Sequence, residues 1–397
     1  MEAACPASIE STLTCNVARL ATGDFMTLEA APTQAFAHSG KLGNVLGLAF
    51  KNAGLTLATL TLYRFWARTA MRRRLWSRVW VMGDPLEYTG SAWELFRGFL
   101  ISLPCFFLPA IFIFYIAPLM MDPVTATWLA IGFYIIANPL IAAARYLMRR
   151  YQLSRTRWRG IRFGLAGSSA RYAFASFGWT ILQTLSLGWY TPAARMNRAK
   201  LMWDNARFGD QPFQFIDDGE SPQQGMWWPF AMGWFGSILS LFVAYFIVFM
   251  IAFAAGLGEY ISQGAESSEQ AAMIFVGIGV ASFVLGLLLM TLAWAPYNAA
   301  AMNRIASLIE LDGARFKLKA KTFSLFGVTL AGWLITIFSL TLLAPVAGFL
   351  QVRYVINRLE VTGAPKFAEI GQSIVPEGTS GEGLGDAFDL DMGVGVV

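Results

Sequence analysis

Uncharged apolar stretches of about twenty residues recur along the chain and alternate with arginine-rich segments. Four of these stretches, at residues 98–121, 126–144, 229–257 and 272–296, contain no Asp, Glu, Lys or Arg. A helix of this length crosses the hydrocarbon core of a bilayer. Buried helices of soluble domains are rarely so long and so free of charge. The pattern therefore predicts an all-α polytopic membrane protein with four transmembrane helices.

Three weaker apolar segments, at 44–63, 172–190 and 324–350, accompany the four spans. The first contains Lys51 and Asn52, and the second contains Gln183 among several Ser and Thr residues. We expect these segments to enter the membrane and return, or to lie along its inner surface. Irregular backbone at membrane depth needs protein around it, so re-entrant segments should pack against the spans. In the alternative, all of them cross and the chain has seven spans.

The distribution of positive charge favours the four-span arrangement. Lys and Arg collect at 64–78, 145–171, 195–207, 304–321 and 353–366, and none occurs between Arg207 and Arg304. Cytoplasmic loops carry an excess of Lys and Arg. With four spans every basic cluster lies inside, whereas seven spans would place two clusters outside. We therefore expect a multi-pass protein of a bacterial inner membrane with both termini in the cytoplasm.

One phrase occurs twice, each time where an apolar segment meets a basic one. TLTLYRFWAR at 59–68 and SLGWYTPAAR at 186–195 share the pattern [Thr/Ser]-Leu-x-x-Tyr-x-x-x-Ala-Arg. A cationic helix, a Gly-containing turn and a short alternating strand follow each copy. The helix–Gly–strand pattern occurs again at Gly160 and Gly313, and a less complete, worn copy of it occurs near Gly363. Gly between alternating runs indicates β-hairpins, which we expect to be small and cytoplasmic.

These repeats divide the chain into three modules, at 36–150, 151–300 and 301–370. The first two each contain an entering segment, a basic helix, a hairpin and two spans, and the third is truncated before its spans. Residues 1–35 are expected to be a disordered arm without a signal peptide, because no cationic start precedes an apolar core. Residues 371–397 are acidic and Gly-rich and are expected to be a disordered tail.

The repeated phrase and the arginine-rich helix after it resemble the YjgN-like family of bacterial inner-membrane proteins over about residues 36–370. The first copy keeps Tyr63, Trp66 and Arg68 but has Thr61 where the family has Gly. The second keeps Gly188, Tyr190 and Arg195 and has Ala193 in place of the Trp. The family is generally described as of unknown function, so the resemblance implies a fold and a location but no catalytic residues.

Composition agrees with this class and offers little enzymatic chemistry. Hydrophobic residues make up 56% of the 397 positions and charged residues only 14%, against about 25% charged in soluble domains. The three cysteines lack the spacing of a metal site or a disulfide framework. His38 is the sole histidine, and no phosphate-binding or hydrolase motif is present. We expect a protein that is not an enzyme and that binds neither cofactor nor metal.

Two groups of residues are candidates for binding. The first is a set of arginines, each worth about 1 kcal/mol near an anionic surface. These arginines either contact anionic headgroups at the cytoplasmic face in a defined site or simply enforce topology. They are Arg72, Arg73, Arg74, Arg149, Arg150, Arg155, Arg157 and Arg159.

The second group lies where an apolar segment of the chain meets an arginine-rich one, and it forms a candidate interfacial motif. Aromatic rings prefer the headgroup level, so an anchoring role competes with a ligand pocket. Nucleic acid is disfavoured as a partner, because the arginine–aromatic stretch at 155–163 lies between membrane segments. The motif residues are Tyr63, Trp66, Arg68, Trp189, Tyr190 and Arg195.

Two functional hypotheses follow. The first is a transport-like or channel-like component, favoured by Pro104, Pro109 and Pro118, which kink a span and can flank a cavity. The alternative is a non-catalytic protein that binds anionic lipid or acts as a membrane scaffold. The middle of the four spans holds no ionisable residue, which weighs against ion-coupled transport.

Overall fold

A computed structural model describes residues 35–40, 42–257, 269–363 and 370–371 of the chain. The predicted N-terminal arm and acidic tail lie almost entirely outside these residues, as does most of the acidic 258–271 loop. The described part is mostly helical, and it also contains two antiparallel sheets.

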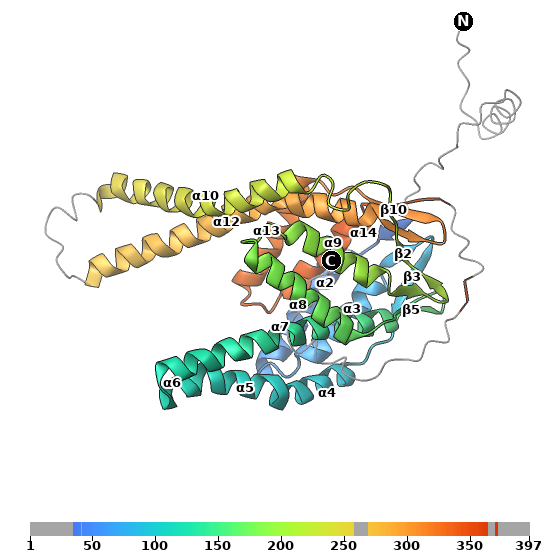
Figure 1. Cartoon of the computed structure of the whole chain (residues 1–397), viewed down its shortest axis with the longest axis horizontal. Coiled ribbons are helices and arrows are strands. Elements are labelled where there is room, and N and C mark those ends of the chain that lie inside the picture. The colour runs from blue at the N-terminus through green and yellow to red at the C-terminus, as the bar shows by residue number, and fades with distance from the viewer. Residues whose placement is uncertain (1–34, 41, 258–268, 364–369, 372–397) are drawn as a thin grey trace, which may run out of the picture.

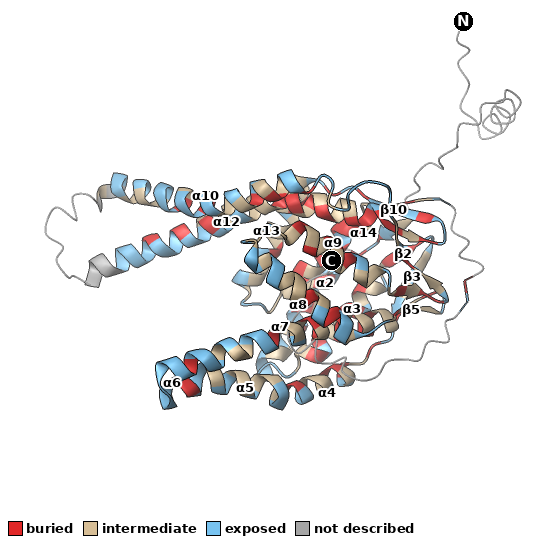
Figure 2. Cartoon of the chain, in the orientation of Figure 1, coloured by how far each residue is buried: buried red, intermediate tan, exposed pale blue. Residues whose placement is uncertain are grey.

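Four long helices form two arms that extend in the same direction (Figure 1). One arm pairs the helical run Ala92–Met120 with α7 (Pro123–Ser154). The other pairs α10 (Trp227–Ala252) with α12 (Glu269–Ser307). Within the described residues, four helices are long and apolar enough to cross a membrane, and each overlaps one of the four predicted spans. Figure 2 shows that the outer parts of both arms are largely exposed, as expected of surfaces that face lipid.

Prolines shape the first arm. Its run comprises α4 (Ala92–Ser102), α5 (Leu108–Ile111) and α6 (Ala117–Met120), joined by the π-helical turns η1 (Leu103–Phe107) and η2 (Phe112–Ile116). Proline cannot donate to the carbonyl four residues earlier. Pro104 and Pro109 lie in and just after η1, where the amide of Leu108 donates instead to Leu103, five residues back. The predicted distortion of this span is therefore a local widening of the helix.

The three weaker apolar segments belong to helical hairpins. The first hairpin is α2 (Leu42–Ala58) with α3 (Arg64–Trp76), and the second is α8 (Ser169–Leu185) with α9 (Thr191–Trp203). The third is α13 (Thr322–Phe338) with α14 (Ala344–Ile356). In each, a helix of 17 residues precedes one of 13. Within the predicted segment at 324–350 the chain reverses at 339–343, so this segment includes parts of both helices.

A hydroxyl side chain closes each hairpin turn in the same way. Its oxygen accepts a hydrogen bond from the backbone amide four residues later, just before the second helix begins. This bond replaces the helical partner that the turn removes. The three bonds run from Tyr63 N to Thr59 Oγ1 (3.0 Å), from Tyr190 N to Ser186 Oγ (2.9 Å) and from Leu343 N to Ser339 Oγ (3.0 Å).

The strands form sheets of seven and four members, and within each sheet successive strands are antiparallel neighbours. They are joined alternately by a tight turn and by a helical hairpin or an arm. The first sheet contains β1 (Phe36–His38), β2 (Val79–Val81), β3 (Asp84–Tyr88), β4 (Thr156–Trp158), β5 (Ile161–Leu165), β6 (Ala206–Phe208) and β7 (Gln211–Pro212). The second contains β8 (Gln214–Phe215), β9 (Ile309–Leu311), β10 (Ala314–Leu318) and β11 (Leu359–Thr362).

These sheets correct the all-α part of the expected fold class, which included only small β-hairpins. Each predicted turn glycine does close a turn, at Gly83, Gly160, Gly209 and Gly313, all with positive φ. The hairpins then pair edge to edge, for example β3 with β4 and β5 with β6. The worn copy near Gly363 contributes the single strand β11, which pairs with β10.

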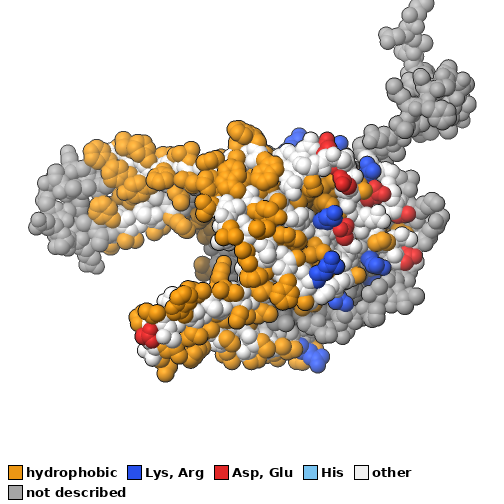
Figure 3. All heavy atoms as spheres, in the orientation of Figure 1, with side chains coloured by type: hydrophobic (Ala, Val, Ile, Leu, Met, Phe, Trp, Pro, Cys, Tyr) orange, Lys and Arg blue, Asp and Glu red, His pale blue; other side chains and the backbone are white. Residues whose placement is uncertain are grey.

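Aromatic side chains connect the sheets and mark the core. The ring of Phe208 lies 4.7 Å from that of Phe163 and 5.5 Å from that of Trp158. Phe316 of β10 packs 6.3 Å from Phe36 of β1 and 6.4 Å from Phe213, so the first strand and a late strand meet. Figure 3 shows charged side chains gathered at the end with the sheets, while apolar side chains cover the arms.

Candidate functional site

A pocket of about 430 Å³ lies between the first and third helical hairpins and the end of α7. This volume is within the range of small-molecule sites. Residues from 56–76 form one side, residues from 340–352 form the other, and Arg149 and Gln152 close one end. Three segments that are far apart in sequence therefore build the site, which we call the basic pocket.

The basic pocket has one strongly charged wall. Arg64, Arg68 and Arg72 of α3 line it together with Arg149 of α7. The three α3 residues are spaced i, i+4, i+8, which places them on one face of the helix. Among the described residues that line the pocket, none is acidic. The wall is therefore rich in arginine, and the guanidinium group of Arg64 also lies over the rings of Phe65 and Phe99 (5.0 and 5.2 Å).

The opposite wall and the turn end of the pocket are apolar. Phe349 and Val352 of α14 are buried there, beside Gly348. At the turns, Leu57 is 61% exposed and Leu340 is 80% exposed. Both turns point in the direction in which the arms extend (Figure 1). The pocket therefore runs from an end near the sheets with Arg72 and Arg149 to an end at the hairpin turns, where exposed leucines accompany Arg64.

Hydrogen bonds fix the two hairpins that form the pocket. The side-chain amide of Asn52 in α2 donates to the carbonyl of Ala67 in α3 (3.4 Å). Trp76, which lines the pocket, donates through Nε1 to Thr156 Oγ1 in β4 (2.9 Å). On the other side, the Asn357 side chain accepts from the His38 backbone amide (3.0 Å) and so ties the end of α14 to β1. The sheets thus set the position of both walls.

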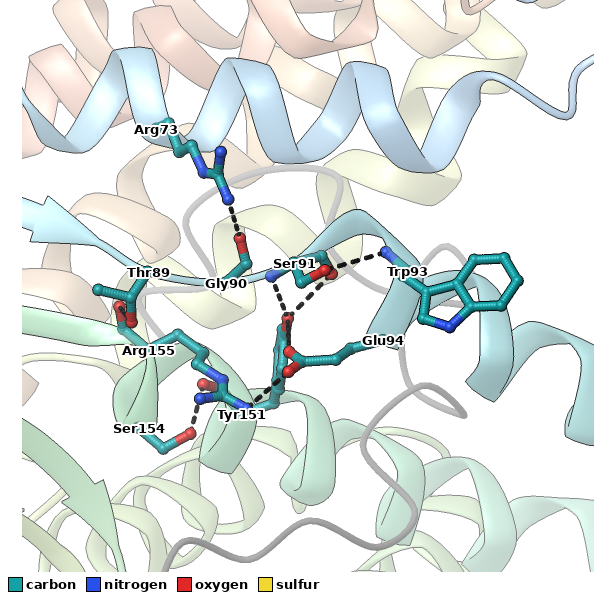
Figure 4. A network of polar contacts seen from close by, with 9 residues as sticks. All are labelled: Arg73, Thr89, Gly90, Ser91, Trp93, Glu94, Tyr151, Ser154 and Arg155. Atoms are coloured by element: carbon teal, nitrogen blue, oxygen red, sulfur yellow. Dashed lines mark hydrogen bonds and ion pairs between the residues drawn. The ribbon is translucent and has the colours of Figure 1, made fainter.

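A polar network beside the pocket joins the first arm to the first hairpin (Figure 4). Glu94 of α4 accepts from Arg155 Nη2 (2.8 Å) and from the Tyr151 hydroxyl (2.8 Å). The same hydroxyl accepts from the Ser91 amide (3.2 Å), and Arg73 Nη2 donates to the Gly90 carbonyl (2.8 Å). The network fixes the end of α7 and with it the pocket residues Arg149 and Gln152.

The candidate arginines fall into different environments. Arg72 and Arg149 line the basic pocket, whereas Arg73 and Arg155 belong to the polar network. Arg159 pairs with Asp84 on the surface. The pocket lining does not include Arg74, Arg150 or Arg157. The eight arginines therefore do not form one site.

The candidate aromatic motif is divided between two hairpins. Tyr63 stacks on Trp66, which packs against Phe96 of the first arm (5.7 Å). Trp189 packs against Trp234 and Phe235 of the second arm (5.8 and 6.1 Å). These rings hold each hairpin turn against an arm, and of the six motif residues only Arg68 lines the basic pocket.

The arginines of the motif also separate. Arg68 lines the basic pocket, while Arg195 donates to Asn298 Oδ1 (3.0 Å) and lies over the ring of Tyr297 (5.3 Å). Tyr190 accepts from Asn197 Nδ2 (3.3 Å). The second hairpin thus uses its arginine to contact α12.

Sequence reasoning missed Arg64 and Gln152 as site residues, and also the contribution of α14. The i, i+4, i+8 spacing of Arg64, Arg68 and Arg72 is visible in the sequence and would have identified the charged face. No local signal connects α14 to α3, because their contact depends on the pairing of the strands.

His38 lies behind the pocket and adds no charge to it near neutral pH. Its ring is buried against Phe349 (5.1 Å), and its Nδ1 accepts from the Gly40 amide (3.1 Å). Burial lowers the pKa of His38, and the nearby charges of Arg353 and Arg78 lower it further. Within the described residues, no three His, Cys, Asp or Glu side chains are grouped to hold a metal ion.

Comparison with known proteins identifies the family. Residues 33–387 match the model of a family of bacterial proteins of unknown function, DUF898. The chain belongs to the DUF898 family. The YjgN-like proteins that the sequence resembles are this family, so the resemblance is confirmed. Neither the curated proteins nor the solved structures contain a match to this DUF898 member.

Proposed function

We propose that this protein is a multi-pass, non-catalytic protein of the bacterial inner membrane that binds an anionic lipid in the basic pocket. The observation that carries the proposal is the polarity of the pocket. Arg68, Arg72 and Arg149 line it along with exposed leucines of the hairpin turns. A lipid has this same division between a charged headgroup and apolar chains.

The proposed placement in the membrane follows from charge. Both arms cross the bilayer, the three hairpins enter from the cytoplasmic side as repeats of one unit, and the sheets and both termini lie in the cytoplasm. Lys and Arg are retained on that side. A helix of 17 residues is about 25 Å long, so the hairpin turns reach deep into the hydrocarbon core. Exposed Leu60, Leu187 and Leu340 at the turns suit that position.

The distribution of ionisable residues favours lipid binding over ion-coupled transport. Proton and ion pathways place Asp, Glu, Lys, Arg or His within spans. In the four long helices such residues lie outside the apolar stretches 98–121, 126–144, 229–257 and 272–296, as with Glu94 and Arg97 in the first and Arg304 in the last. The transport-like or channel-like role stays a prediction of the sequence.

The test is lipid retention by the purified protein. We expect native mass spectrometry to show a co-purifying anionic lipid on the wild type and its loss from the double variant Arg68→Gln/Arg72→Gln. Two lost arginines at about 1 kcal/mol each correspond to roughly a 30-fold weaker association. The matched control is Arg74→Gln/Arg150→Gln, which removes equal charge from α3 and α7 outside the pocket lining.

Equal loss of the anionic lipid from both double variants would show that general surface charge retains it. That result would contradict a defined site. A wild type that retains neutral lipids as readily as anionic ones would also contradict the proposal. Folding of each variant is checked by its elution volume and thermal midpoint in detergent.

A further inference from the structure

The last described residues of the chain, Ile370 and Gly371, are docked on the first sheet. They lie against the turn that joins β6 to β7. The amide of Asp210 in this turn donates to the Gly371 carbonyl (3.1 Å), and the amide of Gly371 donates back to Asp210 Oδ1 (3.2 Å). Such reciprocal bonds satisfy backbone groups on both segments. The two residues are therefore paired with the turn, and we call them the strap.

The side chain of Ile370 anchors the strap in the main hydrophobic core. It is 6% exposed and belongs to the same buried cluster as Phe208 of β6. Ile161 of β5 lies beside it over Gly209 of the turn. Removal of the isoleucine side chain from water favours the docked position.

Gly209 leaves the space that the strap occupies. A Cβ atom at this position would collide with the carbonyl oxygen of Gly371 and would lie 3.0 Å from Ile370 Cγ2. The absence of a side chain lets another backbone approach closely. Three other turn glycines also have positive φ, but an added Cβ would meet nothing there within 4 Å. They are Gly83, Gly160 and Gly313.

The aspartate after the glycine also has a different partner in the two repeats. Gly83 and Asp84 are followed 126 positions later by the same pair, Gly209 and Asp210. Asp84 forms an ion pair with the Arg159 side chain, whereas Asp210 pairs with the backbone of the strap. The second copy of this turn is therefore the one that holds a segment from elsewhere in the chain.

The strap connects the two sheets. It follows β11, the edge strand of the second sheet, and is docked beside β7, the edge strand of the first. The chain itself passes between the sheets at Phe213, whose amide donates to the Ala206 carbonyl (2.9 Å) before β8 pairs with β9. The strap therefore joins the sheets a second time, close to the corner that the chain makes there.

The two sheets carry the two walls of the basic pocket. The first hairpin lies between β1 and β2 of the first sheet, and the third hairpin lies between β10 and β11 of the second. The strap follows β11, the strand into which the third hairpin leads. Its docking therefore links the position of the third hairpin to the sheet that carries the first.

We propose that the strap is a regulatory contact that sets the separation of the two hairpin walls of the basic pocket. When it is docked, it holds the second sheet against the first. When it is released, the third hairpin can move away from the first, as in a hinge motion of packed elements. Local opening of such a short contact leaves the strands paired. The strap acts on the pocket whatever ligand the pocket binds.

Two measurements on the full-length protein in nanodiscs test the strap. Hydrogen exchange at Asp210 reports docking, because this amide donates to the strap. The distance between spin labels reports the separation of the hairpins. The labels are attached to Phe50→Cys in α2 and Phe338→Cys in α13, two exposed positions, in a chain freed of its native cysteines.

Two variants should release the strap. Gly209→Ala places a methyl group against the Gly371 carbonyl, and Ile370→Ser removes the anchor without a change in the turn. In each we expect exchange at Asp210 to become about tenfold faster, as for a locally opened segment, and the label distance to lengthen. The matched control is Gly83→Ala, which puts alanine at positive φ before an aspartate in a turn without a strap. It should leave both readouts unchanged.

Three results would overturn the proposal. The first is unchanged exchange at Asp210 in both Gly209→Ala and Ile370→Ser. The second is faster exchange with an unchanged label distance, since the strap would then not control the pocket. The third is an equal response to Gly83→Ala, which would attribute the effect to turn strain. No lipid ligand is added in these measurements, so a failure of lipid binding would count against the proposed function alone.

Discussion

Gly188 and its counterparts Thr61 and Thr341 occupy the same backbone conformation in the three hairpin turns. Their φ angles are +90°, +72° and +69°. Only glycine adopts this region without strain, and a β-branched residue there is unusual. The amide of each donates to a carbonyl five residues earlier, at 2.7–2.8 Å. The turn geometry is therefore kept even where the sequence departs from glycine.

Strain at this position should be measurable as stability. Gly188→Ala should lower the free energy of unfolding by about 1–2 kcal/mol, because an L-residue is forced to positive φ. Space is not the cause, since the nearest atom to an added Cβ is Trp234 Nε1 at 3.5 Å. Thr341→Gly should change stability in the opposite direction. The measurement is the thermal midpoint in detergent.

Gly178→Ala is the control for this substitution. Gly178 lies inside α8, where an added Cβ meets nothing within 4 Å. Alanine should stabilise that position by about 0.5–1 kcal/mol, because glycine is a poor helix former. Equal effects of the two Gly→Ala changes would argue against strain at the turn.

Residue-level patterns in the sequence predicted part of the site. Arg72 and Arg149 were candidates and line the basic pocket, and Arg68 was included in the aromatic motif. The sequence cannot separate these from Arg73 or Arg155, because all lie in similar basic runs. Their different roles depend on which carbonyl or carboxylate the fold brings near, such as Gly90 or Glu94.

At the scale of elements, the junction between the first arm and the sheets depends on Glu94. Its carboxylate contacts Arg155 and Tyr151 at the end of α7, while it belongs to the first turn of α4. The residues before α4 are fixed by the same contacts, through Ser91 and Gly90. A buried hydrophobic cluster of Phe65, Leu95 and Tyr151 lies at the same junction, and Glu94 adds a charged contact to it.

Glu94→Gln should destabilise the junction by about 1 kcal/mol, since it removes one ion pair and weakens a hydrogen bond while remaining of the same size. Hydrogen exchange should increase at residues 88–92 and 153–158, where α7 meets β4. Arg159→Gln is the control, because the ion pair of Arg159 with Asp84 is exposed on both sides and should contribute little. Faster exchange in both variants alike would contradict a specific role for Glu94.

Other element-level predictions had mixed outcomes. The basic helices and the tight turns follow from local signals and are present where expected, in α3, α9 and the turns at Gly160 and Gly313. The sequence did not locate the turn inside the third apolar segment, because Ser339 and Leu340 read as part of one apolar run. Only comparison with the bond made by Thr59 or Ser186 reveals a turn there.

At the scale of the whole molecule, the sheets gather the ends of the arms and hairpins at one end, and the basic residues lie there with them. Lys200 and Lys317 are exposed at this end of the molecule. Asp122, between the helices of the first arm, is exposed at the other end. The proposed sidedness requires the first end to face the cytoplasm.

Cysteines introduced one at a time at these positions test the sidedness. In a chain freed of Cys5, Cys15 and Cys105, a membrane-impermeant maleimide should label position 122 in cells with a permeabilised outer membrane. It should not label positions 200 or 317 until the inner membrane is opened. Ready modification at 200 or 317 beforehand would reverse the proposed orientation, and the predicted three-module division would need a different topology.

The sequence by itself determined the membrane class, the four long helices and the positions of the tight turns. Each of these depends on the composition or φ preferences of neighbouring residues. The tertiary structure alone decided that the hairpins join into two sheets, and that α14 faces the arginines of α3. The strand pairs connect residues as far apart as Gln214 and Glu310, and α3 and α14 are separated by more than 250 positions. The energy of these contacts comes from strand pairing and packing that no local pattern records.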